Sequence, residues 1–246
     1  MLLDCPIGIA LVERARKRYE VAMETFAGDS LASHRVRLRP HVASDAADHV
    51  RWRNDAEVAY WATAGDVRFW PVAIAAVDRW FSERLPDIEP RSEGVFAVDL
   101  KDGRHIGMVD YRDVDAVARS ATVGITIGEK DLWGQGYGSE ALRLLVGYLF
   151  DHLNLHRVQL DTWSGNERAI RAFARIGFRE EGRLRHAVWG PGRYFDSVVM
   201  GLLRSEWRHG NSRREVVQAG TDTSLGLGFG DAGSNDVTAI DASDRP

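Results

Sequence analysis

Cysteine and long apolar runs are nearly absent from this 246-residue sequence. The single cysteine, Cys5, excludes an internal disulfide framework and any metal site built from several cysteines. This cysteine content is typical of the reducing cytoplasm, where we expect the protein to act. The apolar run from Cys5 to Val12 has no basic residues before it and is too short to span a bilayer.

An excess of positive charge is also lacking. The formal net charge is −4, so no field over the whole chain attracts nucleic acid or an anionic membrane. We therefore expect no nucleic-acid and no membrane partner, although a local basic patch is compatible with this balance. With 44% hydrophobic residues, a chain of this length can bury a full core, enough for one domain with extensions or two small domains.

The two ends of the chain differ from its centre. Apolar residues between Val12 and Phe26 recur at helical spacing, which predicts an amphipathic helix packed on the domain or on a second subunit, as in a homodimer. Membrane anchoring is the weaker alternative for this helix. Residues 208–246 carry one aromatic, Phe229, among scattered Gly, Ser, Asp and Asn, which predicts a flexible tail. The expected organisation is an N-terminal helical extension at 1–33, a domain at 34–207 and a tail at 208–246.

Strand-like and helical segments alternate between these ends. Asp102-Gly103 is a strong hairpin signal, and the alternation of Val123, Ile125 and Ile127 with smaller or polar residues predicts a half-buried strand. The pattern predicts one α/β domain with a mixed central sheet of about six to seven strands flanked by helices, its first half made of antiparallel hairpins. We expect strands at 36–39, 95–100, 105–111, 123–127, 158–162, 186–189 and 195–203, and helices at 44–52, 72–85, 139–152 and 166–176.

A glycine loop connects the strand at 123–127 to the helix at 139–152. Gly134, Gly136 and Gly138 let the main chain approach a ligand closely. The free N–H groups and the positive dipole end of the following helix suit a pyrophosphate group. An ordinary tight turn without a ligand explains three alternating glycines equally well, so the loop alone leaves both readings open.

A second motif lies downstream of the loop. The run Trp133-Gly134-Gln135-Gly136-Tyr137-Gly138-Ser139-Glu140-Ala141 is followed by Asn166-Glu167-Arg168-Ala169-Ile170 and by Gly177-Phe178. With Arg39-Pro40 and Trp52-Arg53-Asn54-Asp55, these motifs resemble the GNAT superfamily of N-acetyltransferases over about residues 34–207. The likeness is strongest to the branch of ribosomal-protein N-terminal, polyamine and antibiotic acetyltransferases. A Rossmann domain fits less well, because it needs an early β-α-β unit where this chain has hairpins.

The resemblance implies a GNAT fold, with acetyl-CoA as co-substrate in a cleft between the strands at 123–127 and 158–162. It implies that an amine, either a peptide or protein N-terminus or a small-molecule amine, attacks the thioester directly. The N–H groups from Gly134 to Ser139 would hold the pyrophosphate, while Asn166 would meet the pantetheine arm and Arg175 an adenosine phosphate. Asn166 could instead cap its helix, and Arg175 could be a solvated surface charge. The expected cofactor-binding residues are Ile125, Ile127, Trp133, Gly134, Gln135, Gly136, Tyr137, Gly138, Ser139, Asn166, Phe173 and Arg175, and no metal is expected.

Proton transfer is less well defined by the resemblance. Asp161 occupies the place of a carboxylate base in relatives that acetylate alanine N-termini, but it is shorter than the usual Glu and would need a bridging water. An ion pair on the strand face is its alternative role. Other members use a Glu where this chain has Thr122, and Phe173 replaces a Tyr that often protonates the departing thiolate. Tyr194, beside the Gly190–Gly192 turn, is a weakly supported substitute acid.

Three hypotheses on function follow from these residues. The first is an active N-acetyltransferase, and the second is a non-catalytic acyl-CoA-binding or regulatory domain that has lost its proton-transfer groups. The third is an interaction module formed by the N-terminal helix and the tail. The sequence does not select the amine, because the selectivity depends on segments expected to be loops, Asn54–Arg68 and Leu85–Arg91. Asp55, Glu57 or Asp66 would favour a cationic acceptor, and surface solvation explains these residues equally well.

Overall fold

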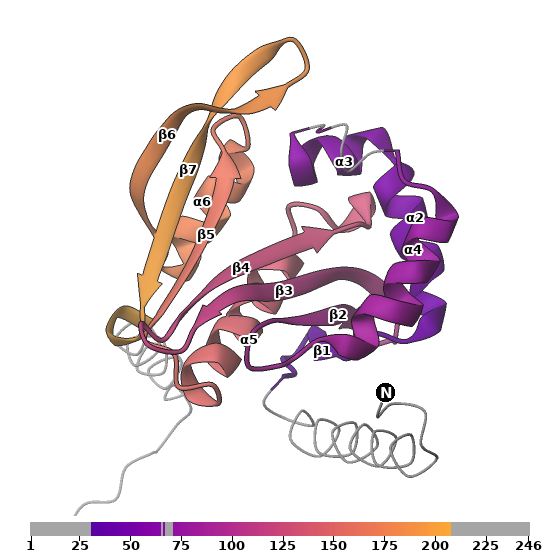
Figure 1. The fold of residues 1–246 in the computed structure, drawn as a ribbon, viewed down its shortest axis with the longest axis horizontal. Coiled ribbons are helices and arrows are strands. Elements are labelled where there is room, and N and C mark those ends of the chain that lie inside the picture. The colour runs from indigo at the N-terminus through magenta and orange to yellow at the C-terminus, as the bar shows by residue number, and fades with distance from the viewer. Residues whose placement is uncertain (1–30, 65, 67–70, 208–246) are drawn as a thin grey trace, which may run out of the picture. The chain divides into compact units, whose positions relative to one another are not determined.

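One mixed sheet forms the centre of the protein in a computed structural model that describes residues 31–64, 66 and 71–207. The helix expected between Val12 and Phe26 and the tail expected at 208–246 lie outside these residues. Within them, seven strands follow the order β1-β2-β3-β4-β5-β7-β6, which confirms the predicted sheet (Figure 1). Only β4 and β5 are parallel neighbours. The strands are β1 (Val36–Arg39), β2 (Gly94–Leu100), β3 (His105–Asp115), β4 (Ser120–Ile127), β5 (Arg157–Trp163), β6 (Arg179–Gly190) and β7 (Arg193–Leu203).

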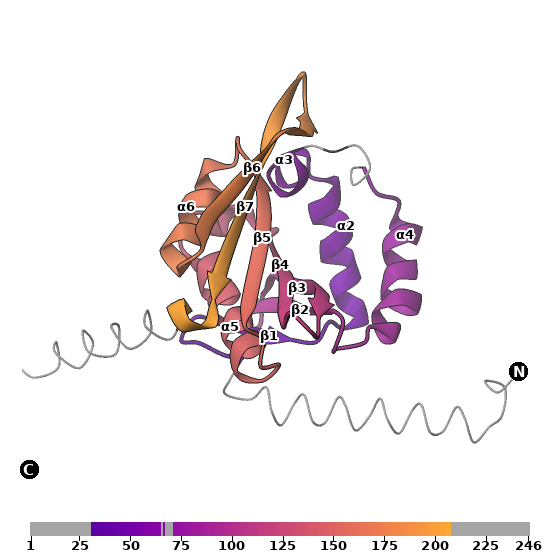
Figure 2. The same cartoon turned by 60° about the vertical axis from the view of Figure 1, so that its left-hand side comes forward.

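Helices cover both faces of this sheet. One group, α2 to α4, lies on one side, and α5 and α6 lie on the other (Figure 2). None of the described helices is both long and apolar enough to cross a membrane. The helices are α2 (Ala46–Asn54), α3 (Ala56–Thr63), α4 (Ile74–Arg79), α5 (Tyr137–Asp151) and α6 (Glu167–Ile176), with a π-helical turn at Trp80–Arg84 and 3-10 turns at Ala43–Asp45, Leu85–Asp87 and Lys130–Leu132.

The expectation of a loop over Asn54–Arg68 is wrong, because α3 occupies much of this segment. Asp55 is the N-cap of α3, and its carboxylate accepts hydrogen bonds from the backbone N–H groups of Glu57 (3.0 Å) and Val58 (3.1 Å). The same carboxylate forms an ion pair with Lys130 Nζ at 2.8 Å. Asp55 therefore has a structural role in holding α3 in place. In the sequence, this residue is also one of those that would favour a cationic substrate.

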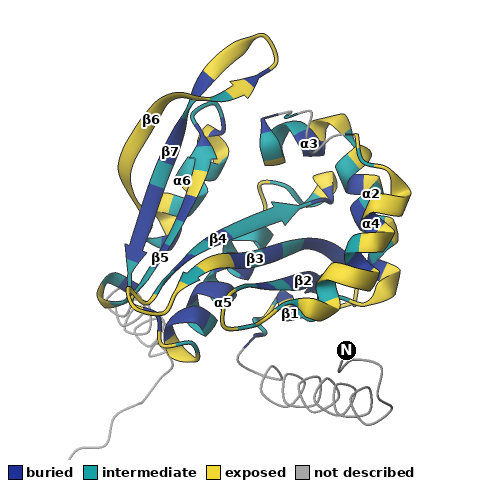
Figure 3. Cartoon of the chain, in the orientation of Figure 1, coloured by how far each residue is buried: buried dark blue, intermediate teal, exposed yellow. Residues whose placement is uncertain are grey.

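The two hairpins differ in how well the sequence predicts them. Gly103 has φ +89°, and Asp102 Oδ1 accepts from the backbone N–H of Arg104 at 2.9 Å, so the predicted turn between β2 and β3 is confirmed. By contrast, β6 starts at Arg179 instead of His186. It is one of the two edge strands of the described sheet and is exposed along most of its length (Figure 3). An edge strand without a buried face shows no apolar alternation, so its first half was not predicted.

The core lies between the sheet and α5. One face of α5 is buried, as its helical spacing of apolar residues predicts, and it packs against alternate residues of β3, β4, β5 and β7 in one continuous cluster. Each fully buried Leu, Val or Phe side chain contributes roughly 1.5–3 kcal/mol to the free energy of folding. This packing fixes the start of α5, and the glycine loop before it, against β4. The α5 residues in the core are Ala141, Leu142, Leu145, Val146, Leu149 and Phe150.

Candidate functional site

Strands β4 and β5 are paired at one end only. Their parallel pairing joins Ser120–Thr122 to Arg157–Gln159, and beyond it the two strands diverge (Figure 1). On its other edge β4 stays paired with β3 as far as Ile127. From Val123 to Ile127, the β5-facing edge of β4 therefore has no partner strand among those described. Its main-chain groups can pair with an extended ligand as a strand would.

A cavity of about 650 Å³ lies where the two strands diverge. Its walls come from β4, β5, the glycine loop, the start of α5, and α6. Of the residues predicted to bind the cofactor, Gln135 is outside the lining, and its side-chain amide donates to the carbonyl of Asp131 at 2.6 Å. The predicted residues that do line the cavity are Ile125, Ile127, Trp133, Gly134, Gly136, Tyr137, Gly138, Ser139, Asn166, Phe173 and Arg175.

The glycine loop ends in a helix without a side-chain cap. Gly134 and Gly136 have φ +77° and +90°, in the region that favours glycine. Gly136 is the N-cap of α5 and offers no side-chain acceptor, so the first N–H groups of α5 have neither an intrahelical partner nor a side-chain partner among the described residues. Gly138 packs against Ile125 and Ile127, where an added Cβ would approach Ile127 Cγ1 to 3.3 Å. These N–H groups and the helix dipole form an anion site at the cavity wall.

A partly buried ion pair balances the charge beside this anion site. Glu140, in the first turn of α5, would repel an anion, but Arg35 pairs with it through Nε at 2.7 Å and Nη2 at 2.5 Å. Burial opposes ionisation of Glu140, yet hydrogen bonds from Ser33 and Arg35 outweigh it and lower the pKa of this carboxyl. Arg35 Nη1 also donates to the carbonyl of Gln135 at 3.0 Å. Arg35 thus neutralises the acidic residue and fixes the loop.

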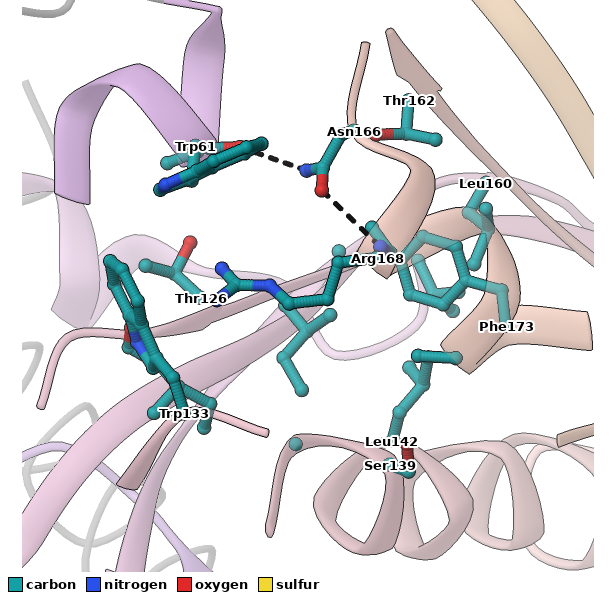
Figure 4. A pocket seen from close by; sticks show the side chains of 18 of the residues that line it. Trp61, Thr126, Trp133, Ser139, Leu142, Leu160, Thr162, Asn166, Arg168 and Phe173 are labelled. Carbon is teal, nitrogen blue, oxygen red and sulfur yellow. Dashed lines mark hydrogen bonds between the residues drawn. The ribbon is translucent and has the colours of Figure 1, made fainter. Parts of the chain in front are cut away.

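Arg168, which the sequence did not single out, lies in the cavity between two tryptophans (Figure 4). Its guanidinium carbon is 4.5 Å from the ring centre of Trp133 and 5.2 Å from that of Trp61. Trp133 is held by a hydrogen bond from Nε1 to the carbonyl of Ile127 at 2.7 Å. This arrangement fixes a positive charge between α3, α6 and the glycine loop. Arg168 belongs to the sequence motif around Asn166 and could have been found there. Its contact with Trp61 depends on the position of α3 in the folded chain, which the motif does not indicate.

Asn166 has the capping role that the sequence offered as its alternative. Its Oδ1 accepts from the backbone N–H of Ala169 at 3.2 Å at the start of α6, and its Nδ2 donates to the carbonyl of Trp61 at 3.1 Å (Figure 4). Asn166 therefore ties α6 to α3 across the cavity. Arg175 lines the cavity from the last turn of the same helix, and its carbonyl accepts from Arg143 Nη2 at 3.2 Å.

Two carboxylates lie on the face of the sheet opposite the α5 core. Asp110 in β3 pairs with Gly124 in β4, and Thr122 in β4 pairs with Gln159 in β5. Since side chains alternate along a strand, Asp161, two residues beyond Gln159, points to the same face as Asp110. Both residues line the cavity. Sequence reasoning missed Asp110, because its place in the same cavity as Asp161 depends on the pairing register of three strands.

The surroundings of Asp110 alter its proton affinity. Burial raises the pKa of Asp110, and this effect outweighs the opposing attraction of Arg112, whose Nη1 donates to Oδ1 at 2.7 Å. A carboxylate with a raised pKa accepts a proton more readily at neutral pH. The space for this carboxylate exists because Gly124 has no side chain, and a Cβ there would overlap Asp110 Oδ2.

The two residues expected to transfer protons are placed differently. Asp161 is exposed at the cavity wall, and its side chain has no hydrogen bond or ion pair with any residue that the structure describes. The alternative role in an ion pair is thus not seen within that part of the chain. Tyr194 is 58% exposed, stacks on His186 and contacts Trp189, and it is not among the cavity-lining residues.

A mixed sheet that opens between two parallel strands, beside a glycine loop and an uncapped helix, is the architecture that the resemblance to acyltransferases predicts. Residues 35–179 match the family model of the GNAT acetyltransferase domain, and the chain belongs to this family. The predicted resemblance is therefore confirmed, and the protein is an N-acetyltransferase by family.

Relatives and solved structures agree with this assignment. The chain is 38% identical over 114 residues to YdaF of Bacillus subtilis (strain 168), a candidate ribosomal N-acetyltransferase, covering 46% of this chain and 62% of the relative. It is 28% identical over 180 residues to the spermidine N(1)-acetyltransferase of Escherichia coli (strain K12), covering 72% and 90%. The spermidine N-acetyltransferase of Vibrio cholerae, solved with CoA and spermine, shares the fold at TM-score 0.61 and 22% identity, covering 70% and 98%.

Proposed function

We propose that the protein transfers the acetyl group of acetyl-CoA to a primary amine that enters from the polar face of the sheet. One observation carries this proposal. A single cavity is lined by the uncapped start of α5 and also by the carboxylates of Asp110 and Asp161. The anionic acetyl-CoA and the cationic amine would thus bind to separate groups, acetyl-CoA to the start of α5 and the amine to the two carboxylates. Both sets of groups line the cavity where β4 and β5 diverge.

The donor side has the groups that acetyl-CoA requires. The N–H groups from Gly134 to Ser139 would hold the pyrophosphate, and Arg168 and Arg175 add positive charge at the cavity wall. The unpaired edge of β4 would accept the amide groups of the pantetheine arm. Bound there, acetyl-CoA supplies a thioester that an amine can attack. We place the reaction in the cytoplasm, as the cysteine content predicts.

The acceptor side has the groups that an ammonium requires. Asp110 and Asp161 attract the cation, and one of them removes the proton that the amine must lose before attack. Asp110 suits this role because burial raises its pKa. Asp161 has no other described partner and could act through a water. An N–H group on the free edge of β4 would polarise the thioester carbonyl.

The molecule that receives the acetyl group is a primary amine in this proposal. An experiment must distinguish two classes of primary amine, a peptide N-terminus and a small polyamine. A CoA-release assay with polyamines, aminoglycosides and short peptides separates them, with the N,N-dimethylated form of each positive amine as a matched control. We expect release with one primary amine class and none with its dimethylated form. Tight acetyl-CoA binding without release for any amine would favour the alternative, a non-catalytic acyl-CoA-binding or regulatory domain. Absence of acetyl-CoA binding would contradict both.

A further inference from the structure

Three histidines from three separate segments converge under α2. His41 follows β1, His49 lies in α2, and His105 is the first residue of β3. One ring nitrogen of each lies within 4.8 Å of the other two. The His41 side chain is 0% exposed, and His49 and His105 are buried. None of the three lines the cavity between β4 and β5, so the cluster is separate from the proposed acetyl-transfer site.

Two of these rings carry a buried nitrogen that lacks a hydrogen-bond partner in the described part of the chain. These atoms are Nε2 of His41 and Nε2 of His49. Aromatic rings surround them, since both histidines pack edge-on against Phe81 with ring centres 5.6 and 5.3 Å away, and Trp80 contacts both. Buried polar atoms are nearly always satisfied, so two unpaired nitrogens within one histidine cluster point to a ligand that the cluster binds.

Carboxylates contact the outer nitrogens of the cluster. His41 Nδ1 is 3.2 Å from Asp45 Oδ2, and His105 Nδ1 is 3.1 Å from Asp48 Oδ2. A histidine that binds a metal through one nitrogen commonly donates the other N–H to a carboxylate, which fixes the tautomer and orients the ring. When Nδ1 of His41 donates to Asp45, its Nε2 is left with a lone pair that can bind a metal.

We propose that His41, His49 and His105 bind one divalent transition-metal ion of the Zn²⁺ type. Three neutral imidazoles suit Zn²⁺, Cu²⁺ or Ni²⁺, whereas Mg²⁺ and Ca²⁺ prefer oxygen ligands. Zn–N bonds of about 2.0–2.1 Å place tetrahedral ligand atoms roughly 3.3 Å apart. The three nitrogens now lie within 4.8 Å of one another, so they must move closer together to bind the ion. Side-chain rotation provides this movement. His105 must also exchange one contact, because its Nε2 lies 3.0 Å from the carbonyl of Gly107.

An ion bound by the three histidines would link the segment after β1, α2 and β3. Its role would be structural, because the cluster is buried away from the cavity.

Titration of metal-free protein with Co²⁺ and Zn²⁺ tests the site. We expect one equivalent of Co²⁺ to give visible absorption bands of a low-coordinate nitrogen site, and Zn²⁺ to displace it. At 100 times its dissociation constant, Zn²⁺ should raise the melting temperature by about 5–10 °C. X-ray absorption of the Zn²⁺ protein should show imidazole nitrogens at about 2.0–2.1 Å. A sulfur ligand near about 2.3 Å would mean binding at Cys5 and would overturn the proposal.

Variants locate the ion. His49→Leu removes one ligand together with an unpaired nitrogen, so the metal-free variant should fold with a melting temperature near that of the wild type. Its Zn²⁺ affinity should fall by more than about 100-fold, and Asp48→Asn should lower affinity about 10–100-fold by freeing His105. His156→Leu, at an exposed histidine, is the matched control and should bind as the wild type does. Unchanged Zn²⁺ affinity in His49→Leu, or no binding by the wild type, overturns the proposal.

Discussion

Asp110 and Gly124 lie opposite each other in the paired strands β3 and β4, and the carboxylate of Asp110 occupies the space that a side chain at Gly124 would fill. The absence of one side chain therefore lets a carboxylate lie over the point where β4 and β5 diverge. This relationship couples a glycine inside a strand, which usually weakens the strand, to the chemistry proposed for the cavity.

Gly124→Ala should lower turnover with little loss of stability. The added Cβ overlaps only the end of the Asp110 side chain, which can rotate away, so the free energy of unfolding should change by less than about 1.5 kcal/mol. With the carboxylate displaced, kcat should fall about 10-fold or more. Gly182→Ala is the control, because a Cβ there meets nothing within 4 Å. Equal kcat values for Gly124→Ala and Gly182→Ala would remove Asp110 from the mechanism.

Asp110→Asn and Asp161→Asn should identify the proton acceptor. Either change keeps the shape and removes the charge, so loss of the true base should reduce kcat/KM at pH 7 by about 10²–10⁴-fold. The loss should shrink toward the amine's own pKa near about 10, because free amine then forms without help. Since burial raises the pKa of Asp110, wild-type kcat/KM should rise with pH through that pKa, and Asp110→Asn should lose this rise.

Acetyl-CoA affinity, measured by calorimetry, should stay near the wild-type value in both carboxylate variants, because neither residue belongs to the anion site. Wild-type rates for Asp110→Asn and Asp161→Asn at every pH would leave deprotonation to solvent. The fold would then contribute positioning and carbonyl polarisation.

Two glycines with nearly equal φ angles give a controlled test of the loop. Gly136 has φ +90° and Gly103 has φ +89°, so alanine at either position should cost a similar 1–2 kcal/mol or so of stability. Only Gly136 borders the start of α5. Gly136→Ala should therefore lose acetyl-CoA affinity, measured by the ligand-induced rise in melting temperature, while Gly103→Ala should retain it. If both variants bind equally well, the pyrophosphate is held elsewhere.

Arg168→Gln should weaken acetyl-CoA binding by about 10–100-fold, because a charge-assisted contact to phosphate contributes roughly 1.5–3 kcal/mol. Arg171→Gln on the same helix is the control, since Arg171 is exposed and pairs with Glu167 at 2.8 Å. The dissociation constants should also depend less on salt in Arg168→Gln than in the control. Tighter binding by Arg168→Gln would show that the guanidinium blocks the cavity.

The donor side of the site could be predicted from sequence because it is local. The glycine loop and the start of α5 are contiguous, and helix capping and backbone freedom there depend on neighbouring residues. The acceptor side depends on contacts between distant strands and helices. Asp110 lines the cavity because the register of β3 and β4 pairs it with Gly124. Arg168 contacts Trp61 because α3 lies opposite α6 across the cavity. The periodicity of either segment contains no such information.

The N-cap of α3 is a helix-start signal that lies within the local sequence. Asp55 precedes a short apolar segment and satisfies two backbone N–H groups, which is a local helix-start pattern. The helix is only eight residues long, so its apolar period is barely repeated. The histidine cluster had no local signal at all, because His41, His49 and His105 meet only in the folded chain.

The stability of the metal-free protein should fall as the pH is lowered from 7 to 5, and His49 should account for part of that loss. Burial lowers the pKa of His49 to about 3, with Asp45 opposing this shift and His41, His105 and Arg53 adding to it. In the unfolded chain the pKa of His49 is about 6.5. Below that pH the unfolded state therefore binds a proton at His49 that the native state does not bind. Stability from this group is thus complete above about pH 6.5 and is lost as the pH falls toward 3.

His49→Leu should flatten this dependence, because leucine has no proton to bind in either state. The maximum slope that one such histidine contributes is about 1.4 kcal/mol per pH unit, measured as the free energy of urea unfolding in the presence of a chelator. His156→Leu, which replaces an exposed histidine, is the control and should keep the wild-type slope. Carboxylates, including Asp110 with its raised pKa, are the same in the wild type and in His49→Leu, so their titration cancels in the comparison. Equal slopes for the wild type and His49→Leu would contradict the lowered pKa of His49 in the native state.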